Sequence, residues 1–188
     1  MKQPRIILLD LGGVVFQSSG TSNQIIDWKV INDLNHKYGY DLNIGRTLLQ
    51  SLLNEYNELT NQYLTDKEFL KEVFDTLEIN SELINLLNQQ SEIIIVSDNY
   101  RENINYISQR YDFDKWSIKQ IYSFEYEMLK EDPKFFARLL EDLKEFKREE
   151  MLFIDDSPNK IDSARKCGIK GIVYKINKQI RQELNEYS

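Results

Sequence analysis

Short apolar runs, separated by longer polar stretches, dominate the hydrophobicity pattern of the chain. Each run is rich in Ile, Val, Leu or aromatic residues and stops at polar ones, which is typical of strands buried on both faces of a parallel sheet. The runs are RIILLD at 5–10, EIIIVS at 92–97, KQIYSF at 119–124, MLFIDD at 151–156 and GIVY at 171–174. We therefore expect five strands.

Helical patterns follow the second, third and fourth of these strands, at residues 102–110, 133–146 and 158–167. Asp132 with Pro133, and Ser157 with Pro158, have the sequence of helix starts, and Gly168 follows the last pattern as a helix stop. Strands that alternate with helices predict an α/β fold, in which helices flank a parallel five-stranded sheet and the crossovers are right-handed.

A long polar helical stretch separates the first strand from the second, from about residue 23 to residue 80. Its last part, TDKEFLKEVFDTL at 65–77, opens with Thr65 and Glu68 in the spacing of a capping box. An insertion of this length is long for a connection and indicates a small helical domain. We expect residues 1–20 and 89–188 to form the core, and residues 21–88 to form a helical cap.

Composition and charge restrict the partners and the compartment. The 188 residues are 41% hydrophobic, enough for a sizeable core, and the net charge of −7 gives no long-range attraction for nucleic acid. The single cysteine excludes an intrachain disulfide framework. No apolar run approaches the ~20 residues of a membrane span. We expect a cytoplasmic protein that binds neither nucleic acid nor membrane.

Polar residues that could carry chemistry stand where the apolar runs stop, and ligands of parallel sheets bind outside the carboxyl ends of the strands. These residues are Asp10, the trio Ser97, Asp98 and Asn99, and the pair Asp155 and Asp156. Any one of them could simply cap a helix or begin a turn. Together, carboxylates from separate strand ends would repel one another unless a cation lies among them, and the oxygen ligands favour Mg²⁺.

Four segments, in this order, resemble the motifs of the haloacid dehalogenase-like (HAD) hydrolase superfamily. The branch is the one whose helical cap follows the first strand, and it includes sugar-phosphate phosphatases. The segments are DLGGVV at 10–15, IVSDN at 95–99, SFEYEMLKEDPKFF at 123–136 and FIDDSPNKIDSARKCGI at 153–169. The resemblance implies a Rossmann-like core with strand order 5-4-1-2-3 and a cap over the carboxyl edge of the sheet.

The resemblance also implies a role for each matching residue. Asp10 would attack phosphorus and form an aspartyl phosphate, and Lys130 would neutralise the nucleophile and the transferring group. The implied phosphate-binding residues are Gly12, Gly13, Ser97, Asp98 and Asn99. The implied Mg²⁺ ligands are Asp10, the Gly12 carbonyl, Asp155 and Asp156. We therefore expect a Mg²⁺-dependent phosphatase of a small phosphorylated metabolite, acting as a monomer or a small homo-oligomer.

Four positions depart from the family pattern. Gly12 stands where most phosphatases of the superfamily have a second aspartate, which acts as general acid and then as base. Asp98 stands where asparagine is common. Glu127 and Glu131 stand where glycine and proline are usual, before and after the lysine. The lone His36 lies in a polar helical segment and is expected at the surface.

The missing aspartate leaves three interpretations open. The chain could be a phosphatase that uses another group or favours good leaving groups. It could be a weakened member that binds a phosphorylated ligand or partner. It could be a 2-haloacid dehalogenase, but those enzymes work without a metal, and the pair Asp155 and Asp156 then has no purpose.

Overall fold

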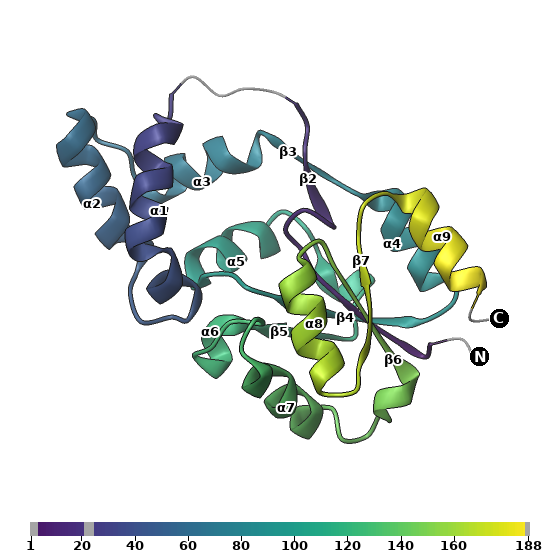
Figure 1. The fold of residues 1–188 in the computed structure, drawn as a ribbon. Coiled ribbons are helices and arrows are strands. Elements are labelled where there is room, and N and C mark those ends of the chain that lie inside the picture. The colour runs from purple at the N-terminus through teal and green to yellow at the C-terminus, as the bar shows by residue number, and fades with distance from the viewer. Residues whose placement is uncertain (1–3, 21–24, 187–188) are drawn as a thin grey trace.

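The computed structural model describes residues 4–20 and 25–186. In these ranges a central parallel sheet is sandwiched between helices, and a group of helices lies beside the sandwich (Figure 1). The sheet order is β5-β4-β1-β6-β7. Its strands are β1 (Ile6–Leu9), β4 (Glu92–Ser97), β5 (Lys119–Tyr122), β6 (Met151–Asp155) and β7 (Lys170–Val173). Counted along the chain and read from the β7 edge, this is the predicted order 5-4-1-2-3.

Alternate residues of β1 face opposite layers of the sandwich. Ile7 and Leu9 pack with α4 (Ser81–Asn88), α5 (Arg101–Ser108) and α9 (Asn177–Asn185). Ile6 and Leu8 pack with α7 (Pro133–Asp142) and α8 (Pro158–Lys166). Because side chains alternate along a strand, Asp10 continues the Ile6 and Leu8 side and faces the layer of α7 and α8.

The cap consists of three helices with a hydrophobic core of their own, built on residues such as Leu53 and Tyr56. They are α1 (Trp28–Asn43), α2 (Leu49–Thr60) and α3 (Asp66–Phe74), at the upper left of Figure 1. The predicted capping box is present at α3, where Thr65 accepts from the Glu68 N–H and the Glu68 side chain accepts from the Thr65 N–H. The helical character of this region is thus confirmed.

A two-stranded antiparallel ribbon connects the cap to the core. It pairs β2 (Phe16–Ser18) with β3 (Leu77–Ile79). The strand β3 lies in sequence that we expected to be helical up to residue 77 and without strand up to residue 80, so this expectation was wrong. Three residues are too few to show the alternation that marks a strand, and the pairing with β2 fixes β3 in place.

The next helix, α4, packs against the sheet. Its residues Leu83 and Leu87 share a hydrophobic cluster with Ile7 and Ile93. The predicted division places this helix in the cap, and the other predicted junction, between residues 20 and 21, borders the segment 21–24 outside the described residues. The division at residues 20 and 88 stays a prediction.

Short helical turns complete the described chain. They are η1 (Phe113–Lys115), α6 (Ser123–Tyr126) and η2 (Arg148–Glu150). In the described ranges, none of the helices combines the length and the apolar character needed to cross a membrane.

Candidate active site

Three carboxylates converge where β1 and β6 end. Leu9 of β1 pairs with Ile154 of β6, so Asp10 and Asp155 leave the sheet at adjoining positions. Carboxylate oxygens of Asp10, Asp155 and Asp156 all lie within 4.8 Å of one another, a spacing that could hold a metal ion. Asp10 and Asp155 are buried and Asp156 is exposed, so the cluster opens toward solvent on one side.

Lys130 lies under this cluster and is completely buried. Its ammonium group donates to Asp10 Oδ1 at 2.6 Å, to Asp155 Oδ2 at 2.7 Å and to the Val96 carbonyl oxygen at 3.0 Å. Burial disfavours the charged ammonium, but the carboxylates of Asp10 and Asp155 outweigh this effect and raise the pKa of Lys130. The lysine is therefore a fixed positive charge that orients the two buried carboxylates.

The carboxyl group of Asp10 has a raised pKa. Burial raises the pKa of Asp10 to about 6, and although the Lys130 charge acts in the opposite direction, the nearby Asp155 charge adds to the increase. Asp10 is thus a nucleophile candidate whose ionised form depends on the positive charges around it.

The two glycines of the turn after β1, Gly12 and Gly13, differ in the space around them. Gly13 has a φ of 72°, and a Cβ atom there would lie 2.9 Å from Asp156 Cγ, so only glycine lets the Asp156 carboxylate come this close. Around Gly12, an added Cβ would meet no heavy atom of the described residues within 4 Å. The space for a larger side chain at position 12 is therefore open.

The polar residues at the end of β4 and in the loop after it, residues 97–99, have different surroundings. Ser97 is buried at the strand end. Asp98 Oδ1 accepts the Lys130 backbone N–H at 3.0 Å, so this carboxylate supports the lysine loop. The Asn99 backbone N–H donates to Ser123 Oγ at 3.0 Å and is thus already bonded, although the family resemblance implies the Asp98 or the Asn99 amide as a phosphate donor. The phosphate-binding roles of these residues stay predictions.

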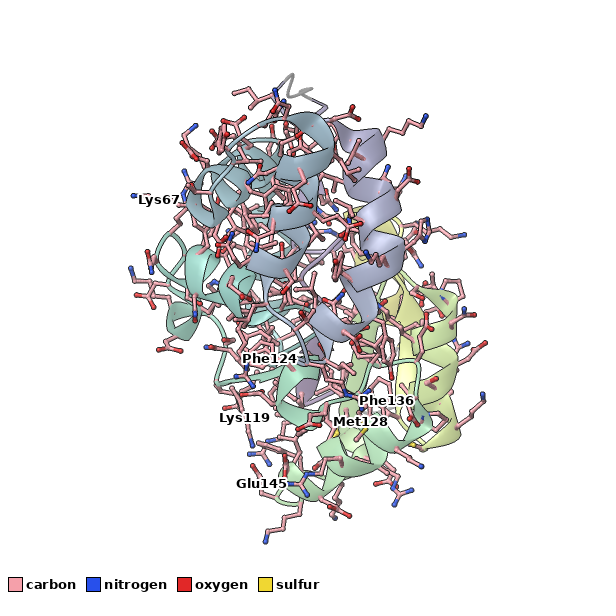
Figure 2. The ribbon with its side chains drawn as sticks, turned by 90° about the vertical axis from the view of Figure 1, so that its left-hand side faces the viewer. Lys67, Lys119, Phe124, Met128, Phe136 and Glu145 are labelled. Atoms are coloured by element: carbon pink, nitrogen blue, oxygen red, sulfur yellow. The ribbon has the colours of Figure 1, made fainter. Side chains whose placement is uncertain are left out.

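The cap contacts the core next to this loop. Ser123, which binds Asn99, also donates to the Asn43 carbonyl oxygen at the end of α1. Gly45, just after that helix, packs against Phe124, which Figure 2 shows below the cap helices. A second contact comes from Glu102 of α5, whose carboxylate accepts the Leu49 N–H at the start of α2 at 3.1 Å. The cap therefore stands at the carboxyl edge of the sheet.

One site residue was missing from the sequence-based prediction. Lys160, in the first turn of α8, pairs with Asp98 Oδ2 at 3.0 Å. The signal that could have found it is the unusual negative charge of Asp98, which calls for a counterion near the site. The other candidate raised by the sequence, His36, is exposed on α1, as expected.

A family model described as haloacid dehalogenase-like hydrolase matches residues 4–168, and the chain belongs to this family of hydrolases. A search of curated protein sequences found no match. The classification therefore rests on the family model and agrees with the four ordered motifs and with the strand order.

Solved structures show the same fold. A HAD family enzyme from Bacteroides thetaiotaomicron superposes with a TM-score of 0.75 at 20% identity, over 93% of this chain and 95% of that one. A predicted HAD-like family hydrolase from Porphyromonas gingivalis gives 0.72 at 19% identity, over 96% and 98%. A 2-haloacid dehalogenase from Pseudomonas syringae pv. Tomato DC3000 gives 0.64 at 13% identity, over 98% and 100%.

Proposed function

We propose that the protein is a Mg²⁺-dependent phosphatase, which hydrolyses a small phosphomonoester through an aspartyl phosphate on Asp10. The observation that carries the proposal is the cluster of Asp10, Asp155 and Asp156, whose oxygens lie within 4.8 Å of one another, with the buried Lys130 bonded to two of them. One ammonium group cannot balance three carboxylates, so the cluster favours a divalent cation.

The residues present fit a hard divalent ion. Asp10, Asp155, Asp156 and the Gly12 carbonyl would supply oxygen ligands, and Gly13 leaves the room that Asp156 needs. When bound, Mg²⁺ would neutralise negative charge on the phosphoryl oxygens. Support comes from the relative of Bacteroides thetaiotaomicron, which has been solved in complex with magnesium and inorganic phosphate at 19% identity to this chain.

The chemistry assigned to Asp10 is a double displacement. One carboxylate oxygen of Asp10 forms a bond to phosphorus while the bond from phosphorus to the substrate's alcohol oxygen breaks. Water then forms a bond to phosphorus while the bond from phosphorus to the Asp10 oxygen breaks, which releases inorganic phosphate and restores the carboxylate. The departing alcohol oxygen takes up a proton from solvent, and the attacking water gives one up to solvent. Lys130 holds the Asp10 carboxylate by a hydrogen bond of 2.6 Å, so the nucleophile needs little reorientation before it attacks.

The glycine at position 12 affects which leaving groups the proposed reaction favours. This residue has no side chain that could give a proton to the departing oxygen, and general acid catalysis is commonly worth ~10²- to 10⁴-fold. Esters whose alcohol leaves readily should therefore react best, and an anomeric sugar phosphate belongs to this class. The state of assembly and the cytoplasmic location stay predictions.

A substrate panel tests the proposal. Purified protein with Mg²⁺ should release phosphate from at least one member of a panel of sugar phosphates, nucleotides and an activated aryl phosphate. Asp10→Asn should abolish the release, and EDTA should stop it. The absence of phosphate release across the panel would refute the proposed activity.

Two other outcomes identify the alternatives. Chemistry on a 2-haloacid that Asp10→Asn abolishes and EDTA leaves unchanged would indicate a dehalogenase, whose fold this chain shares at 13% identity. A thermal shift with Mg²⁺ and beryllofluoride, without turnover of any ester, would indicate a weakened member that binds phosphorylated ligands.

A further inference from the structure

Two lysines stand at the site, and they differ in their free hydrogen-bonding capacity. An ammonium group has three N–H donors. All three donors of Lys130 are used by Asp10, Asp155 and the Val96 carbonyl oxygen. Lys130 is also completely buried. It therefore cannot donate to an incoming phosphoryl group unless it gives up one of these three bonds.

Lys160 is in the opposite situation. Its side chain is 20% exposed, and in the described part of the chain its ammonium pairs with a single carboxylate, that of Asp98. Two N–H donors thus remain for another acceptor. Its place in the first turn of α8 sets it just after the predicted metal ligands Asp155 and Asp156, at the carboxyl edge of the sheet.

Asp98 links the two lysines across the site. Its Oδ1 accepts the Lys130 backbone N–H at 3.0 Å, and its Oδ2 pairs with Lys160 at the same distance. The side chain of Asp98 is only 10% exposed, so this carboxylate is a firm anchor. The charge of Lys160 also reaches Asp10, because it acts to lower the pKa of that carboxyl group.

The charge balance of the site indicates a role for Lys160. Asp10, Asp98, Asp155 and Asp156 bring four negative charges to the site, against two from the lysines. A divalent cation would make this group neutral. With Lys160 absent, an approaching phosphate dianion would meet a net negative site, and it would meet Asp98 without a counterion.

We propose that Lys160 is a second phosphate-binding cation, which Asp98 holds at the rim of the site and which donates to a phosphoryl oxygen when substrate binds. This inference rests on the proposed function, since it assumes that a phosphoryl group enters the site. It also explains how an aspartate at position 98 is compatible with anion binding: the residue positions the lysine and is neutralised by it.

A purely structural role makes a different prediction. If Lys160 only neutralises Asp98, its removal matters only while Asp98 is charged. Asp98→Asn removes the charge but keeps an amide oxygen for the Lys130 N–H. In this background Lys160→Met leaves no unpaired carboxylate at position 98, so the effect of losing the lysine can be measured on its own.

Isothermal titration calorimetry with inorganic phosphate, in saturating Mg²⁺, separates the two roles. The proteins are the wild type, Asp98→Asn, Asp98→Asn with Lys160→Met, and Asp98→Asn with Lys166→Met. Lys166 is the matched control, because it is an exposed lysine at the other end of α8. Melting temperatures of all four report whether each protein is folded.

The proposal expects the Lys160→Met double variant to bind phosphate roughly 10- to 100-fold more weakly than Asp98→Asn, the range for a hydrogen bond between charged groups. The Lys166→Met control should stay within about twofold of Asp98→Asn. Equal affinity of the Lys160→Met double variant and Asp98→Asn would overturn the proposal but leave the phosphatase standing. If the wild type binds no phosphate and hydrolyses no ester, both proposals fail.

Discussion

At the scale of single residues, Asp10 must satisfy two opposing demands. Its burial prevents solvent from competing at the carboxylate, but burial also disfavours the ionised form that the proposed mechanism requires. Lys130 offsets part of this cost through a hydrogen bond of 2.6 Å, while Asp155 adds to it. The ionisation of Asp10 is therefore the property of the site most sensitive to pH and to bound cations.

The pKa of Asp10, about 6 without a metal, predicts the acid limb of the pH profile. Below this pH the carboxyl group is protonated and cannot attack, so kcat/KM should fall as the pH decreases through about 6 at limiting Mg²⁺. Saturating Mg²⁺ favours the carboxylate and should move the limb to lower pH. Phosphate release between pH 4.5 and 8, at several Mg²⁺ concentrations, is the measurement. A limb that does not respond to Mg²⁺ would contradict the assignment of Asp10 as a ligand.

A substitution at Gly12 should increase the rate of phosphate release. A Cβ atom at this position meets none of the described heavy atoms within 4 Å, so Gly12→Asp should fit and supply the missing acid and base. We expect kcat to rise by roughly 10²-fold or more for esters with poor leaving groups and to change little for an activated aryl phosphate. Gly12→Asn is the control of equal size that cannot donate a carboxyl proton. Equal rates for the two variants would show that protonation of the leaving group does not limit the reaction.

At the scale of elements, the loop that carries Lys130 contains a strained residue. Helix α6 ends on Glu127, whose φ of 54° lies in the left-handed region that favours glycine. The backbone requirement explains why glycine is usual at this position in the family. With glutamate at this position, Lys130 still reaches its three acceptors.

Relief of this strain should stabilise the protein. The left-handed conformation costs a residue with a side chain roughly 1 to 2 kcal/mol, and the greater freedom of glycine in the unfolded chain takes back roughly half of this. Glu127→Gly should thus raise the melting temperature by about 2 °C. Glu131→Gly, four residues further on and without a positive φ, should lower it. The two variants have the same composition, so thermal melts compare the backbone effect alone.

At the scale of the whole molecule, the candidate site lies where the cap meets the sheet. Ser123 connects the Asn99 N–H in the loop after β4 to the Asn43 carbonyl oxygen in the cap. The carboxylates come from two different strand ends, and Lys130 comes from a third segment. A metal ion that joins the carboxylates should therefore stabilise the folded chain as a whole.

Mg²⁺ should raise the melting temperature, since a ligand at 100 times its Kd adds about 2.7 kcal/mol to the free energy of unfolding. Asp156→Asn should remove most of this effect. Asp156 is the suitable position because it is exposed, whereas Asp10 and Asp155 are bonded to Lys130, and their removal would leave that buried charge short of a partner. Melts with EDTA and with Mg²⁺ compare the two proteins. An equal Mg²⁺ shift in both would place the metal elsewhere.

The sequence was sufficient for the parts of the structure that depend on local pattern. The strands of the sheet appear in the sequence as β-branched runs. The carboxylates stand where these runs end, which predicts that they lie close together at one edge of the sheet. The strand order came from the family resemblance. Physical reasoning from residues alone would have left it open, because pairing between strands is a long-range property.

The missed features depend on contacts between distant segments. Lys160 looks like any polar residue of an amphipathic helix until α8 is packed beside the loop that holds Asp98. The β3 strand exists because β2 lies next to it. The bond from the Asn99 N–H to Ser123 was missed for the same reason, since it joins residues 24 positions apart.

The central claim is covalent catalysis by Asp10, and the most direct test is to find the phosphoryl group on it. With an activated aryl phosphate the first displacement needs no general acid, whereas the second lacks a base at position 12, so the aspartyl phosphate should accumulate. We expect acid quenching during turnover, followed by peptide mass spectrometry, to show one added phosphoryl group on the peptide that contains Asp10. The adduct should be absent with EDTA and in Asp10→Asn. Turnover without this adduct, or an adduct that persists in Asp10→Asn, would contradict the mechanism.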